Sequence, residues 1–289
     1  MQREKIAIVT GSSTGNGFET SLMLARNGFY TYATMRNLDK SKTITDIATK
    51  DSLPLQVLQL DVTEDKSVKD AIDTILGKRG RIDVVVNNAG YDAFGAVEDL
   101  SVEELKAQFE TNFFGAIRVM KAVLPTMRKQ RRGTIVNVSS VGGLVGIPLN
   151  SAYISSKFAL EGFSESMQYE LEEFGIKVIL IEPGVVKTNF FENSKAAKNT
   201  ASSNSPYAEL AKKVSEGFKP MLENNSSSPI QVAQVILKAI TSEKANTRYL
   251  VGNDAAAIVD KKRSSSDIEL QQWIKESLIQ QKGFIRGRG

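Results

Sequence analysis

The chain has 289 residues, of which 41% are hydrophobic and 24% are charged, and its formal net charge is +4. This composition is typical of a globular protein with one large or two small domains, and the small net charge predicts no nucleic-acid partner. The sequence contains no cysteine and no histidine. It therefore excludes disulfides, thiolate chemistry, Ser-His-Asp triads and the usual ligands of a zinc site, and we predict no metal.

Acid/base chemistry near neutral pH must then use tyrosine, lysine or carboxyl groups. No apolar run approaches the roughly 20 residues needed to cross a bilayer. The first residues, MQREKIAIVTGSS, lack the apolar region of a signal peptide. We therefore expect a cytoplasmic protein without a membrane span.

Short apolar runs alternate with segments that have helical patterns. Seven runs predict strands: KIAIVTG, FYTYAT, LQVLQLD, IDVVVNNAG, TIVNVSS, IKVILIEPG and RYLVG. Because they are apolar almost throughout, they are typical of parallel strands that are buried on both faces. The alternation predicts an α/β protein, a single-domain Rossmann fold with a doubly wound, seven-stranded parallel sheet and helices on both faces.

Several helix boundaries are marked in the sequence. A helix over 63–78 is expected to begin with a Thr63 cap, and the S-x-x-E pattern at Ser101 predicts a capping box for a helix that ends at Pro125. A further helix is expected to begin with the Ser/Pro pair near residue 229. Residues 189–229 are rich in Ser, Asn and Lys, with a helix over 206–219. They predict a substrate-binding lid or a disordered insert, and 264–289 a C-terminal helix and basic tail.

The segment TGSSTGNG at 10–17 follows the first strand and opens a helix. Glycines at this spacing allow a tight turn and a close approach of the backbone to a pyrophosphate at the helix N-terminus. The alternative is a Gly/Ser-rich turn that binds no ligand. The predicted phosphate-binding residues are Gly11, Ser13, Thr14, Gly15, Asn16 and Gly17.

The adenosine end of the predicted site depends on the next three strands. The second strand ends in Met35 and Arg36 without a carboxylate, and a guanidinium suits a 2′-phosphate, so we predict NADP(H) rather than NAD(H). Asp61 is expected to accept from the adenine amino group, and Val62 to pack against the ring. The small residues Asn88, Ala89 and Gly90 are expected to pass beneath the adenosine ribose, while Asn87 braces neighbouring strands.

A candidate catalytic group follows the fifth strand. Ser140 ends that strand, Tyr153 begins the next helix, and Lys157 follows Tyr153 by about one helical turn, so all three can surround one carbonyl oxygen. A free tyrosine has a pKa near about 10, and a nearby ammonium together with an oxidised nicotinamide is expected to lower it. An isolated Y-x-x-x-K would more simply be an exposed helix pair. The other motifs, in this order, favour the catalytic interpretation.

Together these motifs resemble the short-chain dehydrogenase/reductase family, in the branch with T-G-x-x-x-G-x-G and Y-x-x-x-K. The resemblance covers residues 5–190 and the late strand. It implies that Tyr153 is the proton donor and acceptor, that Lys157 also binds the nicotinamide ribose, and that Ser140 polarises the substrate oxygen, with Ser139 a weaker candidate. It further implies that Asn112 holds a water linked to Lys157. The residues implied to contact the nicotinamide half are Pro183, Gly184, Val185 and Thr188.

Some details go beyond the general family pattern. Asn16 stands where the family usually has an apolar residue, and we expect it to alter the affinity for the cofactor without abolishing binding. The segments YATMRN, GIPLNSAYISSKFALEGF and IEPGVVKTNF are similar to the 17β-hydroxysteroid and retinol dehydrogenase branch.

The resemblance implies an oxidoreductase that interconverts a small-molecule ketone or aldehyde and an alcohol. It also implies a homodimer or homotetramer paired through helices at 101–128 and 152–174. A non-catalytic NADP(H)-binding regulatory protein and a 3-oxoacyl-type reductase remain as alternatives. A sugar-nucleotide epimerase shares Y-x-x-x-K, but the glycine spacing and the short C-terminal region disfavour it.

Overall fold

The computed structural model describes residues 4–188, 195–197, 205–224 and 226–281. Its centre is a seven-stranded parallel sheet with the order β3-β2-β1-β4-β6-β7-β9. The strands are β1 (Lys5–Val9), β2 (Phe29–Met35), β3 (Leu55–Gln59), β4 (Val84–Asn87), β6 (Gly133–Val138), β7 (Ile176–Pro183) and β9 (Arg248–Val251). Each of the seven apolar runs supplies one strand, so the predicted sheet is confirmed.

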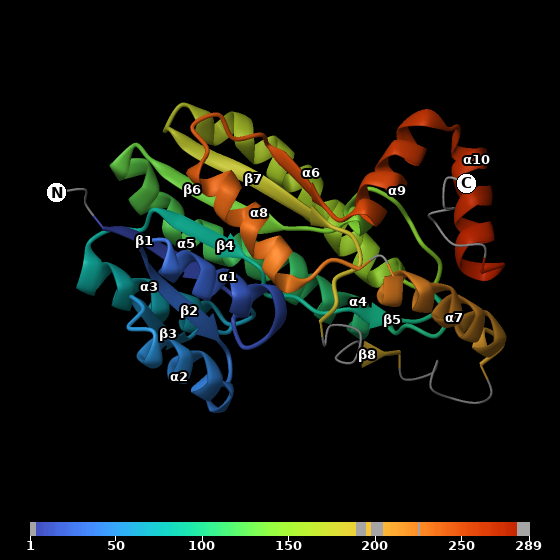
Figure 1. Ribbon diagram of the computed structural model, residues 1–289, viewed down its shortest axis with the longest axis horizontal. Helices are drawn as coiled ribbons and strands as arrows, with labels where there is room; N and C mark the ends of the chain where they lie inside the picture. Colours follow the sequence, from blue (N-terminus) through green and yellow to red (C-terminus); the bar gives the residue numbers. More distant parts are fainter. Residues whose placement is uncertain (1–3, 189–194, 198–204, 225, 282–289) are drawn as a thin grey trace.

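The helices form a layer on each face of this sheet (Figure 1). The longer ones are α1 (Gly15–Arg26), α2 (Lys42–Lys50), α3 (Asp65–Arg79), α4 (Val102–Phe109), α5 (Gly115–Gln130), α6 (Ser151–Glu172), α7 (Ala208–Asn224), α8 (Pro229–Thr241), α9 (Asn253–Ser264) and α10 (Asp267–Ile274). The short ones are the 3₁₀ turns η1 (Leu38–Ser41) and η3 (Val141–Gly143) and the π-helical segments η2 (Glu110–Phe114) and η4 (Lys275–Ile279).

Apolar side chains on both faces of the strands hold these layers together. On one face α3, α5 and α6 bury residues such as Ile72, Val123 and Leu160 against the sheet. On the other face α1 and α8 bury Leu24 and Ile236. The central strands therefore have no polar face, as a parallel sheet covered on both sides requires. The strand order reverses between β1 and β4, which opens a crevice at their carboxyl ends.

Side-chain caps begin two of the predicted helices. In α4 the Glu104 amide donates to Ser101 Oγ at 3.1 Å and the Ser101 amide donates to Glu104 Oε2 at 2.9 Å, which confirms the capping box. A second box at Ser228 precedes Pro229 and begins α8 as expected. The expected Thr63 cap is wrong. Its hydroxyl donates to Asp61 Oδ1 at 2.7 Å, and α3 begins two residues later.

The helix boundary expected at Pro125 is also wrong. α5 continues through Pro125 to Gln130 and ends at Arg131, whose φ is 53°. Val123 and Met127 on either side are fully buried, at 0% exposure. The packing of this apolar face against the sheet outweighs the amide that proline lacks.

A two-stranded parallel sheet accompanies the main one, and no pattern in the sequence indicated it. It pairs β5 (Ala93–Phe94) with β8 (Lys195–Ala196). β8 belongs to the 189–229 segment, and so does α7, which covers most of the helix expected over 206–219. Residues 189–194 and 198–204 lie outside the described residues, as does most of the expected basic tail.

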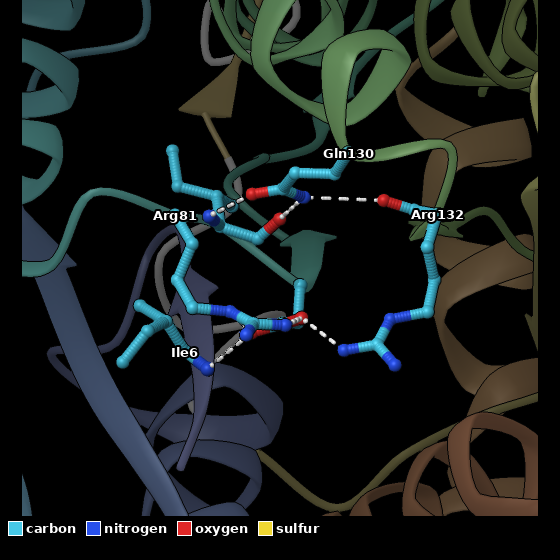
Figure 2. A network of polar contacts seen from close by, with 6 residues as sticks. Ile6, Arg81, Gln130 and Arg132 are labelled. Carbon is cyan, nitrogen blue, oxygen red and sulfur yellow. Dashed lines mark hydrogen bonds and ion pairs between the residues drawn. The ribbon is translucent and has the colours of Figure 1, made fainter. Parts of the chain in front are cut away.

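A buried ionic network fixes the end of the sheet opposite the crevice (Figure 2). Asp83 precedes β4, is 6% exposed, accepts from the Ile6 amide at 2.9 Å and pairs with Arg81 and Arg132. Burial opposes its ionisation, but the Arg81 guanidinium, the Ile6 amide and Arg132 together hold the pKa of Asp83 below its ordinary value. Gln130 of α5 donates to the Ile82 carbonyl at 2.7 Å. The network therefore ties α5 to β1 and β4.

Candidate active site

The carboxyl ends of the strands open into a cavity of about 1430 Å³. The residues predicted to bind cofactor or to act in catalysis line this cavity, with the exceptions of Gly17 and Asn112. Both exceptions lie directly behind the cavity wall and support residues that form it.

The glycine loop needs its glycines for two reasons, backbone conformation and close packing. Gly11 and Gly15 have φ values of 69° and 60°, in the left-handed region that other residues avoid. A Cβ on Gly17 would lie 2.4 Å from the Gly11 carbonyl oxygen and 2.4 Å from Asn88 Nδ2. The loop and the start of α1 therefore leave no room for a side chain at residue 17.

The N-terminus of α1 fits a phosphate. Thr14 occupies the cap position, but its side chain makes no capping hydrogen bond, so the first amides of α1 have no intrahelical or side-chain acceptor. Asn16 Oδ1 is buried and has no hydrogen-bond partner among the described residues. Amides at a helix N-terminus beside a polar side chain are suited to an anion.

Amide side chains hold the neighbouring strands together below this loop. Asn88 Nδ2 donates to the carbonyls of Thr10 and Gly11 at 3.0 and 3.2 Å, which fixes the β4 end to the glycine loop. Asn87 Nδ2 donates to Asn137 Oδ1 at 2.8 Å, so it links β4 to β6 as expected. Their hydrogen bonds give the cavity floor a fixed shape.

The far end of the cavity carries two cationic side chains. Arg36 follows β2 and Lys40 lies in η1, and both are exposed side chains that line the cavity. Of these two cations, only Arg36 was expected from the sequence to bind the cofactor. Lys40 is four residues later, and the 3₁₀ turn after β2 brings it to the same opening.

Asp61 and Val62 form the wall beside these cations. Asp61 Oδ1 accepts from the Thr63 amide at 3.0 Å and from the Thr63 hydroxyl at 2.7 Å, so this oxygen holds its own turn. Val62 is 6% exposed, and a Cβ on Gly115 would lie 2.7 Å from its Cγ2. The two residues are therefore positioned by α5 and by the turn. Their contacts with adenine stay predictions.

The two serines that follow β6 have different neighbours. Ser140 Oγ accepts from the Gly142 amide at 3.0 Å and is hydrogen-bonded to Tyr153. Ser139 Oγ lies against Glu161 instead, and both would be close to a Cβ on Gly143. This difference favours Ser140 over Ser139 as the serine that meets a substrate.

Tyr153 and Lys157 lie on one face of α6, beside the end of β6. Lys157 is 6% exposed, its Nζ donates to the Val138 carbonyl at 2.8 Å, and it lies 5.6 Å from the centroid of the Tyr153 ring. Burial lowers the pKa of Lys157 to about 8, and Glu161 opposes this shift. Lys157 can therefore change its charge not far from neutral pH.

The pKa of Tyr153 lies above its ordinary value, whereas the sequence led us to expect a lowered pKa in the site with bound cofactor. Burial raises it above its ordinary value, the hydrogen bond with Ser140 lowers it, and the nearby Asp92 carboxylate raises it again. The phenol is thus protonated in this structure. The expectation included the positive charge of an oxidised nicotinamide, which acts only when the cofactor is bound.

Asn112 supports the cavity wall. It lies in the π-helical segment η2, is 1% exposed, and both atoms of its amide bond the Tyr91 backbone, at 3.1 Å from the Tyr91 amide and 3.0 Å to the carbonyl. Its Nδ2 also lies 3.3 Å from Ser156 Oγ. Irregular π turns often mark functional positions in a helix. The role of Asn112 in holding a water stays a prediction.

The segment after β7 is held by a residue that the sequence analysis missed. Asp254 Oδ2 accepts from the Val185 amide at 2.6 Å, and Asp254 is 0% exposed. A Cβ on Gly184 would lie 2.2 Å from that oxygen, so only glycine fits there. Asp254 is the second residue of α9, where a carboxylate is favourable, and this acid at a helix start was the available signal.

Beyond the catalytic group the cavity wall is mostly apolar. It is lined by Val145, Ile147, Phe218, Met221, Leu222 and Ile258. Three of these residues come from α7, within the segment that looked polar in the sequence. α7 is amphipathic: Val214 and Met221 are buried at 0% and 3% exposure, and two of its polar residues, Ser215 and Lys219, also line the cavity.

The comparisons with known proteins agree with this geometry. The family model for short chain dehydrogenases matches residues 5–199. This chain belongs to the short-chain dehydrogenase family. In this dehydrogenase the match includes the glycine loop, Ser140, Tyr153 and Lys157.

Two curated relatives are similar over most of their length. A 3-ketodihydrosphingosine reductase of Bacteroides thetaiotaomicron is 36% identical over 96% of this chain and 95% of the relative. Retinol dehydrogenase 8 of Bos taurus is 39% identical over 85% of this chain and 82% of the relative. Such relatives support an oxidoreductase that acts on CH–OH groups.

Two solved structures have the same fold. A short-chain dehydrogenase from Streptomyces avermitilis has a TM-score of 0.81 and 32% identity, and the match covers 96% of this chain and 98% of the other. ElxO with NADP bound has a TM-score of 0.71 and 27% identity, with 86% and 97% covered. The second structure is of a protein in complex with NADP.

Two further observations concern metal ligands and membrane-spanning helices. Within the described ranges, no cluster of three or more acidic, histidine or cysteine side chains is arranged to hold a metal ion. No helix in the same ranges is both long and apolar enough to cross a membrane.

Proposed function

We propose that this dehydrogenase interconverts a ketone or aldehyde and an alcohol with NADP(H), and that Tyr153 is the general acid and base. The single observation that carries the proposal is the cavity itself. It has a glycine loop suited to phosphate at one end and Ser140, Tyr153 and Lys157 at the other.

The bound cofactor would supply or accept the hydride at the carbonyl carbon. The chain's own residues handle the proton and the developing charge. Tyr153 gives its phenolic proton to the substrate oxygen in the reductive direction and removes it in the oxidative direction. The Ser140 hydroxyl, already bonded to Tyr153, can turn to the same oxygen and stabilise its negative charge.

Lys157 supports this exchange by electrostatics. Its ammonium lies 5.6 Å from the Tyr153 ring centroid, in a buried setting where charges interact strongly. It favours the phenolate that Tyr153 becomes after giving its proton. Lys157 can also donate to the nicotinamide ribose, which the cavity would place near Pro183, Gly184 and Val185.

The preference for NADP(H) rests on Arg36 and Lys40. Arg36 and Lys40 line the cavity after β2, whereas Asp39 between them does not, and this arrangement suits a 2′-phosphate better than a 2′-hydroxyl. The 27%-identical ElxO structure has NADP bound, which is consistent with this preference.

The substrate would be a small molecule with an apolar body. The apolar side chains of α7 and α9 that line the cavity are Phe218, Met221, Leu222 and Ile258, and they lie beside the polar lining residues Ser215 and Lys219 of α7. The described part of the 189–229 segment would therefore bind substrate. We leave the remainder of that segment and the end of the 264–289 region as predictions.

We also propose that two copies pair through η2 and α6. Phe114, Phe158 and Tyr169 are 47%, 43% and 76% exposed. Large aromatic side chains exposed on two helical segments that contact each other suit an interface between copies of a chain. Sedimentation of the purified protein tests this assembly, and a monomer at all concentrations would contradict it.

The activity test is the oxidation of NADPH, followed by its absorbance, with a panel of ketones and aldehydes. Each polar compound is matched to one of equal reactivity with a longer alkyl chain. We expect turnover that increases with the apolar chain. NADPH binding without turnover of any compound would instead favour a regulatory NADP(H)-binding protein, and 3-oxoacyl thioesters as the best substrates would favour the reductase alternative.

A further inference from the structure

A buried cluster of charges lies next to Lys157, and the proposed reaction does not use it. Glu161 of α6 and Glu182 of β7 are 4% and 2% exposed. Arg248 of β9 is bound to both: its Nη1 contacts Glu161 Oε2, and it lies 2.6 Å from Glu182 Oε1. One guanidinium therefore serves two buried carboxyl groups.

Arg248 alone cannot neutralise this cluster. Its other nitrogen, Nη2, lies 3.7 Å from Glu165, whose side chain is 62% exposed and solvated. The buried part then has two potential negative charges and one positive charge. A further cation, Lys157, lies one helical turn before Glu161 on α6, and the two interact electrostatically. Lys157 supplies the second positive charge that balances the two carboxylates.

Glu161 is built so that its charge can change. Its Oε1 is buried and, in the part of the chain that the structure describes, has no hydrogen-bond partner of normal geometry; the same is true of Ser139 Oγ beside it. A Cβ on Gly143 would be 3.2 Å from Glu161 Oε1 and 2.8 Å from Ser139 Oγ, so the two oxygens share one small space. A protonated Glu161 can donate to the Ser139 hydroxyl, and an ionised Glu161 can accept from it, so this contact is compatible with both charge states.

The electrostatic surroundings agree with this geometry. Burial raises the pKa of Glu161 to about 7. The Ser139 hydroxyl lowers it, Glu182 raises it, and Arg248 lowers it. The groups that face Glu161 are thus Lys157 and Glu165 on α6, Ser139 after β6, Glu182 on β7 and Arg248 on β9. Glu161 lies one helical turn from Lys157 and also lies beside the Ser139 hydroxyl.

We propose that Glu161 is a positioning residue that keeps Lys157 charged, and that Arg248, shared with Glu182, sets whether Glu161 is ionised. When Glu161 is ionised, the Lys157 ammonium has a counter-charge and stays available to Tyr153 and to the cofactor ribose. When Glu161 is neutral, Lys157 loses its proton at lower pH. This inference rests on the proposed function, because it concerns the group that acts on Tyr153.

The test compares Glu161→Gln with Glu165→Gln. Both changes remove one carboxylate from α6 near Arg248, but only the first is buried beside Lys157. We would measure kcat/KM for the best carbonyl substrate, and the Kd of NADPH by fluorescence, each across pH 6 to 10 (about the range in which lysine and glutamate of this kind titrate).

We expect the alkaline limb of both profiles to move to lower pH by about 1 unit in Glu161→Gln. In Glu165→Gln both profiles should match the wild-type. A lower kcat in Glu161→Gln with an unmoved limb would mean a structural role only and would overturn the inference. A wild-type protein that does not bind NADPH at all would contradict the proposed function instead.

A measurement on the wild-type protein covers the case in which Glu161→Gln does not fold. With ¹⁵N-labelled lysine, the Lys157 Nζ resonance can be assigned as the one missing in Lys157→Met. We expect this resonance to show two inflections with pH, the first as Glu161 titrates and the second as Lys157 loses its proton. A single inflection would overturn the inference.

Discussion

Lys157 Nζ lies 5.6 Å from the centroid of the Tyr153 ring, while its hydrogen bond of 2.8 Å goes to the Val138 carbonyl. The strand β6 thus holds the lysine, and α6 holds both residues on one face. This arrangement keeps a cation near the phenol without a direct bond between them. The Tyr153 hydroxyl is instead hydrogen-bonded to Ser140, and both residues line the cavity.

Replacing Tyr153 with Phe should lower kcat by about 100- to 10,000-fold, because it removes the group that transfers the proton. The Kd of NADPH should change little, since the ring remains. Steady-state kinetics and fluorescence titration measure the two quantities. Tyr169→Phe is the matched control, because Tyr169 lies on the same helix and is 76% exposed. Near-normal kcat in Tyr153→Phe would refute the assigned role.

Removing the cations beside the predicted 2′-phosphate should lower kcat/KM for NADPH and leave kcat/KM for NADH almost unchanged. Arg36→Ala should lower kcat/KM for NADPH by about 10- to 100-fold, the loss expected for a hydrogen bond to a charged group, and adding Lys40→Ala should lower it further. Kinetics with both cofactors measure the ratio. Lys42→Ala is the control, because the Lys42 side chain is 84% exposed and paired with Asp46. An equal loss for both cofactors would argue against 2′-phosphate recognition.

A methyl group at Gly17 should disrupt the phosphate loop, whereas one at Gly77 should not. The Gly17 Cβ would overlap the Gly11 carbonyl oxygen at 2.4 Å, while a Cβ on Gly77 in α3 meets nothing within 4 Å. We expect Gly17→Ala to lower the Tm and weaken NADPH binding. Gly77→Ala should raise stability by about 0.5–1 kcal/mol, because alanine is favoured in a helix. Thermal unfolding with and without NADPH checks both changes.

The stability of the protein should depend on the ionisation of Glu161. Its pKa is raised from an ordinary 4.5 to about 7 by burial, so the folded state keeps a proton that the unfolded state loses between these values. Its contribution is therefore fully present below pH 4.5 and is lost as pH rises through about 7.

Denaturant unfolding across this range measures the effect. Relative to Glu161→Gln, the wild-type protein should lose free energy of unfolding as the pH rises from 4.5 to about 7. Glu165→Gln should follow the wild-type curve, since its side chain is 62% exposed. Parallel curves for wild-type and Glu161→Gln would show that Glu161 titrates normally.

Local sequence patterns were sufficient to predict the sheet and most residues that line the candidate site. Strands that are apolar on both faces can only be buried in a parallel sheet, and glycines at 11, 15 and 17 can only form a tight loop before a helix. The order of strand ends then brings Arg36, Ser140 and Tyr153 to one crevice. The first two inferences use the pattern within a single element, and the third uses the order of the elements along the chain.

Boundaries that depend on competition between contacts could not be predicted in the same way. Thr63 had a suitable residue type for a cap, but its hydroxyl bonds Asp61. Pro125 had the residue type that ends helices, but buried neighbours carry α5 past it. In each case a contact formed by the fold outweighed a local preference.

The sequence by itself predicted the fold, the glycine loop and the candidate tyrosine and lysine, because periodicity and short motifs encode them within single elements. Only the tertiary structure decided which distant groups surround those residues. Asp254 reaches the Val185 amide from 69 residues further along the chain, and Arg248 reaches Glu161 from 87 residues further along. Buried partners of this kind determine the charge and position of the site residues through contacts in space. Because the partners are far apart along the chain, no local sequence pattern indicates these contacts.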